Sequence, residues 1–270
     1  MRIKYFCPIW GSTDMEYAAF FEKAKNAGYD GVEMSLPMDD AEKKEILVLL
    51  KEYNLELIAQ HWETLTADFE LHKKEYKARM INLASAKPLL VNTQTGKDFF
   101  TFEQNAELID IAKKVSQEYA VKIIHETHRG KFSFAAHIVS QFLTKIPDLK
   151  LTLDISHWCN VAETLLEDQT EAVDLAIERT EHIHSRVGFS EGPQIPDPRA
   201  PEWKEVLETH TNWWQKVIDK RRAEGRTEFT IAPEFGPYPY MTQLPFKNEP
   251  ITDQWAVNVF MMEHLKKTLK

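Results

Sequence analysis

The chain has 270 residues, of which 43% are apolar and 28% are charged, a balance typical of globular proteins of one or two domains. This composition excludes a disordered chain, a collagen-like chain and a small disulfide-rich scaffold. Lys and Arg number 33 against 42 Asp and Glu, which gives a net charge of −9. Because no basic run is longer than the three residues Lys220, Arg221 and Arg222, we expect no nucleic-acid partner.

No segment of the sequence is apolar enough to predict a membrane span. The longest stretch without a charged residue, 132–144, is shorter than the roughly 20 residues that a spanning helix needs. Arg2 and Lys4 interrupt the apolar start of the chain, and no signal-peptide pattern follows. The two cysteines, Cys7 and Cys159, lack the spacing of a metal knuckle or a redox pair. We therefore expect a cytoplasmic protein with reduced thiols and no membrane partner.

Eight short apolar or β-branched runs that end in polar residues are predicted strands. In chain order they cover residues 3–10, 31–36, 55–61, 89–93, 122–126, 150–154, 181–186 and 229–234. Between them, side chains such as those at 17, 20, 21 and 24, or at 46, 49, 50 and 53, recur with the spacing of a helix face. The same periodicity runs through 108–115 and 173–177. Strand and helix therefore alternate along the whole chain.

Eight such units of about 34 residues match the size of a (β/α)8 barrel, which takes about 250 residues. A doubly wound sheet is the competing architecture. Against it, Pro8, Ile9, Trp10 and Gly11 follow the first strand, where a dinucleotide fold has its glycine-rich turn. No linker rich in Gly or Ser divides the chain. The sequence predicts an α/β protein, a single (β/α)8 TIM barrel, in one domain over residues 1–270.

The longest predicted loops follow the last two strands. A proline-rich loop of about two dozen residues follows the seventh strand, and an aromatic loop, 235–250, follows the eighth. Links from helix to strand, such as 26–30 and 146–148, are short. Long ordered loops are usually functional, and both of these lie at carboxyl ends of strands, where barrel enzymes have their active sites.

Metal-ligand side chains stand at the ends of four consecutive predicted strands. They are Glu126, Asp154, His184 and Glu234. One carboxylate at a strand end is more often a helix cap or an ion-pair partner, but four ligands in succession indicate one site. Three carboxylates and one imidazole suit Mn²⁺, Mg²⁺ or Co²⁺ and also admit Zn²⁺. We expect one divalent ion, with Mn²⁺ as the first choice.

Strand alternation tests this arrangement, because side chains two apart on a strand share a face. If Asp154 points into the barrel, then Leu151, Leu153 and Ile155 face the helices, which is the apolar set that a helix-facing layer needs. His157 is three residues from Asp154 and cannot point inward from the same regular strand. We therefore expect His157 in the loop above the strand, near the ligands but not among them.

The seventh strand carries three polar residues on one face. His182, His184 and Arg186 follow one another at two-residue spacing, which stacks them from deep in the barrel to its mouth. We expect His184 to bind the ion and Arg186 to bind substrate, whereas His182 fits a core histidine. His125, next to Glu126 on the fifth strand, should face a helix.

The segment 28–33, Gly-Tyr-Asp-Gly-Val-Glu, together with the strand-end ligands, resembles the xylose isomerase-like barrel superfamily, and the resemblance covers the whole chain. That group includes sugar phosphate isomerases, keto-sugar 3-epimerases, inosose dehydratases and apurinic-site endonucleases. For its epimerase branch, the resemblance implies metal ligands at Glu126, Asp154, His184 and Glu234. It also implies that His157 and an arginine downstream of the strand-seven ligand, either Arg186 or Arg199, hold the substrate.

The endonuclease branch of that group uses additional histidines to hold three metal ions. His61 fits its strand-three position, but the fourth strand ends Asn92-Thr93-Gln94-Thr95 without a histidine. Arg199 stands where a further histidine ligand is expected. We therefore expect a single metal ion, and a small sugar or polyol as the substrate.

The ligand set predicts a metal-dependent sugar isomerase or keto-sugar epimerase. A divalent ion that chelates a carbonyl and the neighbouring hydroxyl stabilises the cis-enediolate formed when the α-proton leaves. Strands five and eight are three places apart in the ring, so Glu126 and Glu234 should face each other across the substrate as catalytic acid and base. The alternatives, in order, are an inosose-type polyol dehydratase, an apurinic-site endonuclease-like phosphodiesterase and a non-catalytic sugar-binding barrel.

Several further residues are candidates for contact with substrate. They are Trp10, Trp62, Trp158, His61 and Glu33. The tryptophans stand at strand ends, where an aromatic face suits the C–H groups of a sugar, although barrel-mouth packing explains them as well. Glu33 equally fits an anchor of the second strand. Trp213 and Trp214 should begin a helix and serve packing or a subunit contact, which leaves a homo-oligomer open.

Overall fold

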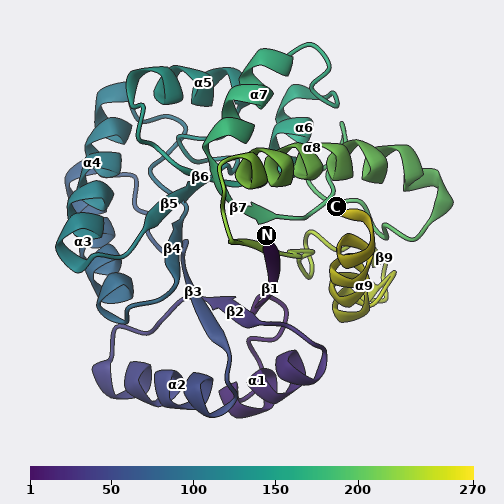
Figure 1. Cartoon of the computed structure of the whole chain (residues 1–270), viewed down its shortest axis with the longest axis horizontal. Helices are drawn as coiled ribbons and strands as arrows, with labels where there is room; N and C mark the ends of the chain where they lie inside the picture. The colour runs from purple at the N-terminus through teal and green to yellow at the C-terminus, as the bar shows by residue number, and fades with distance from the viewer.

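The computed structural model describes residues 1–270 and contains one closed ring of eight parallel strands. The strands are β1 (Arg2–Pro8), β2 (Gly31–Met34), β3 (Glu56–His61), β4 (Leu90–Thr93), β5 (Ile123–Glu126), β6 (Leu151–Leu153), β7 (Thr180–His184) and β8 (Glu228–Ala232). Strand β1 pairs with β2 on one side and β8 on the other, so the ring has no free edge. Figure 1 shows the helices surrounding the strands. The predicted single (β/α)8 TIM barrel is confirmed.

The helices follow the strands in regular order. They are α1 (Tyr17–Asn26), α2 (Asp40–Glu52), α3 (Phe69–Ser85), α4 (Phe102–Tyr119), α5 (Ala136–Lys145), α6 (Ser156–Ala162), α7 (Thr170–Arg179), α8 (Lys204–Ala223) and α9 (Gln254–Thr268). Only β6 is followed by two helices, the short α6 and then α7. None of the helices combines the length and the apolarity that a membrane crossing requires.

Side-chain caps define where several helices begin. Asp39, Asp68 and Asp253 each accept backbone N–H groups in the first turn of α2, α3 and α9. Thr101 and Gln104 form a reciprocal capping box at the start of α4. Each cap satisfies donors that the first helical turn leaves unpaired. The caps therefore fix where the loops at the carboxyl rim of the barrel end.

Four strands end two residues earlier than the sequence predicted: β1 at Pro8, β2 at Met34, β7 at His184 and β8 at Ala232. The alternation of side chains continues beyond the last ladder pair, which is why the sequence pattern overestimates these strands. Arg186 and Glu234 consequently lie in rim segments just above the barrel rather than on strands.

The inside of the barrel has an apolar layer below a polar one. The apolar layer consists of Phe6, Ile58, Leu90, Ile124 and Ala232. Two residues further along β3, β4 and β5 stand Gln60, Asn92 and Glu126, all buried. They share the inward face with the apolar residues because alternate side chains of a strand point the same way. The polar layer therefore lies at the carboxyl end, where the rim loops begin.

A second and larger apolar core of 56 buried residues joins the outer face of the strands to the helices. Leu151, Leu153 and Ile155 belong to this core, whereas Asp154 belongs to a cluster of inward polar groups. The predicted alternation at the end of the sixth strand is therefore the alternation in the structure. Helices outside and a filled interior leave the strands buried on both faces, as parallel sheets require.

Helix α8 starts at Lys204, well before the two tryptophans that were expected to begin it. A short 3₁₀ turn, η1 (Pro201–Trp203), leads into it, with proline at a first-turn position where its missing N–H costs nothing. Trp214 is buried in the core and Trp213 is half-buried. The predicted start of this helix was wrong, because the helical turn begins at Pro201 and continues into α8. The loop after β7 is therefore shorter than predicted.

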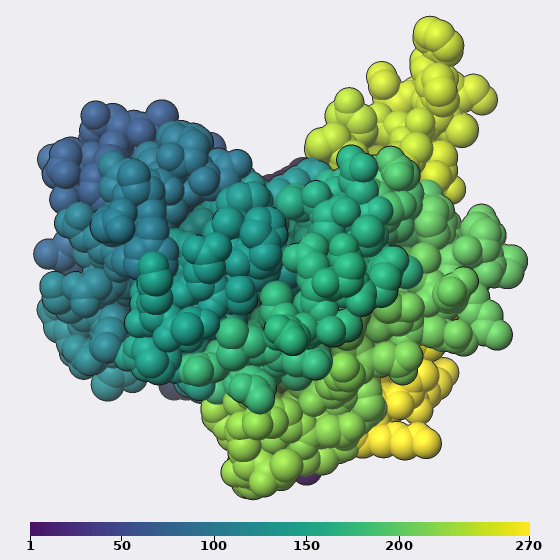
Figure 2. Space-filling model, turned by 90° about the horizontal axis from the view of Figure 1, so that it is seen from above, coloured from purple at the N-terminus to yellow at the C-terminus, as the bar shows by residue number.

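The segment between β8 and α9 projects from the barrel. It contains the small antiparallel pair β9 (Gln243–Leu244) and β10 (Glu249–Pro250), and Figure 2 shows it as the yellow lobe at the upper right. Near its start, the ring of Tyr240 packs edge-on against Trp10, which follows β1, with ring centroids 4.9 Å apart. This contact ties the loop after β8 to the loop after β1 at the barrel mouth.

His210 connects α8 to the rim loop after β7 through buried hydrogen bonds. Its Nδ1–H donates to the carbonyl of Val206 at 2.9 Å, and its Nε2 accepts the N–H of Gly188 at 3.2 Å. Burial lowers the pKa of His210 to about 4. The imidazole is therefore neutral in the folded chain at pH values where the unfolded chain takes up a proton.

We expect His210→Gln to reduce the acid sensitivity of folding. The neutral imidazole contributes stability that is fully present above pH 6.5, the ordinary pKa, and is lost as the pH falls toward 4. Between pH 7 and pH 5 this loss is about 2 kcal/mol of the free energy of unfolding, and it should be absent from the variant. Urea unfolding at both pH values measures it. The exposed His137→Gln serves as control, and an equal pH effect in both variants would contradict the expectation.

Candidate functional site

Four buried side chains converge at the carboxyl end of the barrel. They are Glu126 at the end of β5, Asp154 directly after β6, His184 at the end of β7 and Glu234 two residues after β8. One ligand atom from each lies within 4.8 Å of those of the others. The structure thus brings together, from four neighbouring strands, the four side chains that the sequence predicted as metal ligands. We call this set the carboxylate cluster.

The two nitrogens of His184 face different partners. Its Nδ1 lies 2.8 Å from Oε2 of Glu234 and 3.7 Å from Oε1 of Glu126. The contact to Glu234 does not have the direction of a hydrogen bond and the contact to Glu126 is too long for one, so this buried nitrogen has close carboxylates but no hydrogen-bond partner. Its Nε2 lies 2.9 Å from Oε1 of Glu33, on the other side of the ring. Nδ1 is therefore the atom that His184 presents to the carboxylate cluster.

The carboxylate cluster carries an excess of negative charge. Burial raises the pKa of Asp154 to about 6, although the guanidinium of Arg186 opposes the shift. Burial acts against protonation of His184, but the surrounding carboxylates, Glu234 first among them, raise the pKa of this imidazole well above its ordinary value. Both shifts mean that the cluster holds on to protons, as groups do where positive charge is lacking. A bound cation would supply that charge.

The donor set of the carboxylate cluster fits a divalent ion. Glu126, Asp154 and Glu234 would supply oxygen ligands, and His184 would supply Nδ1. Carboxylate oxygens suit Mn²⁺ and Mg²⁺, and a mixed oxygen and imidazole set also accepts Co²⁺ or Zn²⁺. The unpartnered Nδ1 supports this fit, because buried polar atoms are normally hydrogen-bonded.

Arg186 is completely buried against the carboxylate cluster. Its guanidinium forms an ion pair with Asp154 and lies 3.9 Å from Oε2 of Glu234. The rings of Trp10 and Tyr240 stand 5.7 and 4.7 Å from its guanidinium carbon, within the range of cation–π contacts. These contacts hold a planar, permanently charged donor beside the cluster.

Two neutral histidines lie next to Arg186. His157 stands in the first turn of α6, not in the predicted loop, because the carboxylate of Asp154 accepts the N–H of Ser156 and the helix starts at once. Its Nε2 lies 2.7 Å from the guanidinium of Arg186, and its ring lies 3.9 Å from that of His128. Burial lowers the pKa of His128 to about 3 and that of His157 well below its ordinary value. Neutral imidazoles can accept a hydrogen bond from a hydroxyl group.

Glutamine side chains donate to the two outer carboxylates of the cluster. Gln60 donates from Nε2 to Oε1 of Glu234 at 3.0 Å, and Nε2 of Gln94 lies 3.3 Å from Oε2 of Glu126. The sequence analysis did not identify these amides, nor His128 or Tyr240, as site residues. Strand alternation was the available signal for Gln60, which follows the inward Ile58 by two residues.

A cavity of about 410 Å³ opens at the carboxylate cluster, a size that suits a small molecule. Its polar lining includes Glu126, Glu234, Arg186, His128, Gln60 and Gln94, and its apolar lining includes Trp10, Trp62 and Tyr240. Aromatic faces beside a few convergent polar groups are typical of a ligand site. Of the predicted tryptophans, Trp10 and Trp62 line this cavity.

Five of the predicted substrate residues do not line the cavity: Trp158, Arg199, His61, Glu33 and His157. Trp158 is completely buried, and its indole N–H donates to the carbonyl of Ser133 at 2.8 Å, because the early start of α6 turns this side chain into the core. Arg199 pairs with Asp197 in the rim loop after β7. His61 is buried with both ring nitrogens bonded to threonine hydroxyls. Arg186, not Arg199, is therefore the arginine at the site.

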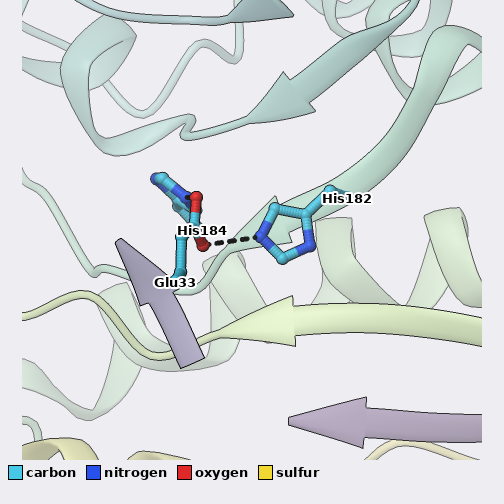
Figure 3. Close-up of side chains that lie close together, drawn as sticks. All are labelled: Glu33, His182 and His184. Carbon is cyan, nitrogen blue, oxygen red and sulfur yellow. Dashed lines mark hydrogen bonds and ion pairs between the residues drawn. The ribbon is translucent and has the colours of Figure 1, made fainter. Parts of the chain in front are cut away.

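Glu33 and His182 lie together deeper in the barrel. Glu33, at the third position of β2, contacts the imidazoles of both His182 and His184, as Figure 3 shows, and it does not line the cavity. His182 also bonds to Thr230, so it is a hydrogen-bonded interior histidine, as expected. His125 bonds to Thr95 outside the cavity.

The structure is thus a closed barrel in which carboxylates and an imidazole that could hold a divalent ion cluster at the carboxyl ends of the last four strands. The chain belongs to the xylose isomerase-like TIM barrel family, whose sequence profile matches residues 21–186, more than half of the chain. The family resemblance inferred from the sequence is thereby confirmed.

Solved structures of similar fold cover nearly the whole chain. D-psicose 3-epimerase with D-tagatose from Clostridium cellulolyticum H10 is 16% identical and covers 99% of both chains, with a TM-score of 0.64. The apo form of 3-keto-D-glucoside 4-epimerase from E. coli is 12% identical and covers 98% of this chain and 99% of that chain, with a TM-score of 0.64. A xylose isomerase-like TIM barrel protein from Mycobacterium smegmatis in complex with magnesium is 11% identical and covers 98% and 96%, also with a TM-score of 0.64. A search of curated proteins found no match. At these identities the likeness shows the fold alone.

We expect Trp158→Phe to lower the free energy of unfolding by about 1–3 kcal/mol, because it removes a buried donor and leaves the carbonyl of Ser133 unsatisfied. Trp62→Phe is the matched control. Trp62 is 49% exposed, and its replacement should change stability by no more than about 0.5 kcal/mol. Urea unfolding measures both values. An equal decrease in the free energy of unfolding in the two variants would show that the hydrogen bond of Trp158 to Ser133 does not stabilise the core.

Proposed function

We propose that this protein is a divalent-metal-dependent sugar isomerase or keto-sugar epimerase that acts on a small sugar or polyol. The observation that carries the proposal is the pair of carboxylates Glu126 and Glu234. They reach one cavity from strands three places apart in the ring and share a buried cluster with Asp154 and His184. Membership of the family and the fold shared with two epimerases support it. We propose one ion per chain, Mn²⁺ first, with Mg²⁺, Co²⁺ and Zn²⁺ as alternatives.

Two opposed carboxylates allow a proton to leave one face of a carbon and return to the other. A divalent ion in the carboxylate cluster would act as a Lewis acid on the carbonyl and the neighbouring hydroxyl of a ketose or aldose. One of Glu126 and Glu234 takes the α-proton, and the other returns a proton to the opposite face, which inverts that carbon. Return of the proton to the adjacent carbon instead would isomerise the sugar.

The remaining cavity residues orient the substrate and the carboxylates. Arg186 donates hydrogen bonds from a guanidinium held by aromatic rings, and His128 accepts one from a hydroxyl group. Gln60 and Gln94 donate to the two acid/base carboxylates and keep them in place. The apolar rings of the lining suit sugar C–H groups and exclude water from the reacting carbon.

A phosphodiesterase that acts on nucleic acid is less well supported. The net charge of −9 opposes approach of a polyanion. Strand β4 ends Asn92-Thr93 without a histidine, and Arg199 pairs with Asp197 instead of facing the site. These observations support the proposal of a single-ion site with a small substrate.

Reduced thiols support a cytoplasmic location for this activity. Cys7 and Cys159 are both buried and free, and burial raises the pKa of both thiols. Proteins without disulfides are typical of reducing compartments. We propose the cytoplasm as the location, and one domain over residues 1–270.

Glu126→Gln and Glu234→Gln should each abolish exchange of the α-proton. With Mn²⁺ added in D₂O, the wild type should incorporate deuterium into a keto- or aldo-sugar next to the carbonyl, as NMR would detect. Each variant should exchange at least about 100-fold more slowly, because a general acid or base contributes roughly that factor or more. Glu63→Gln, which alters a carboxylate outside the cavity lining, is the control and should retain exchange.

The products separate the proposal from its alternatives. Exchange retained in both site variants would refute the acid/base assignment. A dehydrated product would assign a polyol dehydratase, since it loses a β-hydroxyl after the same proton abstraction. Absence of exchange in the wild type across a panel of ketoses and aldoses would leave a sugar-binding barrel.

Metal content gives an independent test of the site. We expect elemental analysis to find about one divalent ion per chain in wild type and a reduced content in His184→Ala, because the variant lacks the nitrogen ligand. His210→Gln is the matched control, because His210 is also a buried histidine but bonds to Val206 and Gly188, away from the carboxylate cluster. Absence of any metal, even after incubation with Mn²⁺, would remove the Lewis acid and refute the mechanism.

A further inference from the structure

We propose that Glu33 is a positioning residue that fixes the tautomer and orientation of His184, so that Nδ1 of His184 is held ready for a divalent ion. The inference rests on the proposed metal site. It assigns a role to a buried carboxylate that lies outside the cavity and touches no substrate.

The geometry places Glu33 between two imidazoles. Its Oε1 lies 2.9 Å from Nε2 of His184, and its Oε2 lies 3.1 Å from Nε2 of His182. Figure 3 shows Glu33 beside the rings of His182 and His184. Glu33 comes from β2 and both histidines come from β7, three places away in the ring. All three side chains are completely buried. One carboxylate therefore uses both oxygens on neighbouring histidines of a single strand.

The hydrogen bonds determine which nitrogen of His184 carries the proton. The carboxylate of Glu33 is only an acceptor, so Nε2 of His184 must be the donor. The side-chain amide of Asn92 donates to the same oxygen at 2.8 Å. It also lies 3.2 Å from Nε2 of His184, but its shorter bond goes to Glu33. With a proton fixed on Nε2, Nδ1 is the nitrogen that faces the carboxylate cluster, and its lone pair can bind an ion once Nδ1 has given up its own proton.

His182 holds Glu33 in turn. Its Nε2–H donates to Glu33, and its Nδ1 then accepts the hydroxyl of Thr230 at 2.7 Å. Both carboxylate oxygens of Glu33 thus face imidazole nitrogens at hydrogen-bond distance, which fixes the orientation of the carboxylate. The chain of contacts runs from Thr230 on β8 through His182 and Glu33 to His184. An imidazole whose far N–H is bonded to a carboxylate is a better oriented and more basic ligand.

A second ion held by Glu33, His182 and His184 themselves is the competing explanation, because their ligand atoms also lie within 4.8 Å of one another. Against it, the carboxylate oxygens already accept the imidazole N–H groups at hydrogen-bond distances. Nε2 of His182 and Nε2 of His184 each have one oxygen of Glu33 as hydrogen-bond partner. Nδ1 of His184, by contrast, has no hydrogen-bond partner. The need for a cation lies on the Nδ1 side of the ring.

The test is the affinity for Mn²⁺ of metal-free wild type, Glu33→Ala and Glu33→Gln, measured by competition with a fluorescent chelator. Loss of a carboxylate that orients a metal-bound histidine typically weakens metal binding 10- to 100-fold, and we expect that loss in Glu33→Ala. Glu33→Gln should bind with intermediate affinity, because its Oε1 can still accept the N–H of His184. His182 can then donate from Nδ1 to the carbonyl of Thr230, 3.0 Å away, so this variant should fold.

Glu181→Gln is the matched control. Glu181 is also a buried glutamate, on the strand that carries His184, but it pairs with Lys122 and Arg226. Its replacement should lower the free energy of unfolding and leave Mn²⁺ affinity within about twofold of wild type. A glutamate that merely stabilises the barrel would behave in the same way at position 33.

Each outcome decides between the assignments. Mn²⁺ binding by folded Glu33→Ala and Glu33→Gln within twofold of wild type would overturn the positioning role and leave the metal site intact. Two ions in wild type, one of them lost in Glu33→Gln, would make Glu33 a ligand and overturn the proposal. No Mn²⁺ binding by wild type would overturn the metal-dependent function and the positioning role together.

Discussion

Buried negative charge at the carboxyl end of the barrel is the constraint on which the rest of the site depends. Four carboxylates lie there with almost no exposure to solvent: Glu33, Glu126, Asp154 and Glu234. Desolvated carboxylates are unfavourable unless cations or hydrogen-bond donors face them. His184 and Arg186 supply positive charge or N–H groups, and side-chain amides supply further donors. A divalent ion would supply the missing positive charge. Nδ1 of His184, which has no hydrogen-bond partner among these carboxylates, is an atom that such an ion could bind.

The barrel brings these groups together because its strands are parallel and its ring is closed. Parallel strands present their carboxyl ends at one rim, so residues from β5, β6, β7 and β8 meet although they are far apart in sequence. The apolar layer around Phe6 and Ile58 fills the interior below them. The polar layer therefore lies at the end of the barrel where the loops that follow the strands begin. Closure between β1 and β8 also sets Trp10 beside Tyr240.

The cavity at the carboxylate cluster has a polar side and an aromatic side. Glu126, Glu234 and the neutral His128 form a polar side of the cavity that is suited to hydroxyl and carbonyl oxygens. Trp10, Trp62 and Tyr240 form an apolar side suited to the C–H faces of a sugar. This combination favours a reaction in which a proton moves at a carbon while its oxygens are held, and it explains why the proposed acid/base pair consists of residues that also belong to the ion site.

Much of the fold, and the convergence of four polar strand-end side chains, could be predicted from the sequence because both depend on local periodicity. Alternation along one strand is enough to place Asp154 inward and Leu151 and Leu153 outward, and the same logic applies to His184. The start of α6 was missed, since it depends on the Asp154 carboxylate accepting the N–H of Ser156. Because α6 begins at Ser156, His157 lies in a helix and Trp158 lies in the core.

Sequence by itself determined the strand and helix alternation, the barrel and the identity of four side chains at strand ends, because each follows from spacing within a short segment. Only the tertiary structure decided which arginine lies at the site, that Gln60 and Gln94 hold the opposed carboxylates, and that Glu33 faces two histidines across the barrel. These contacts join strands and loops distant in sequence. Their geometry is set by ring closure and packing, which no local pattern encodes.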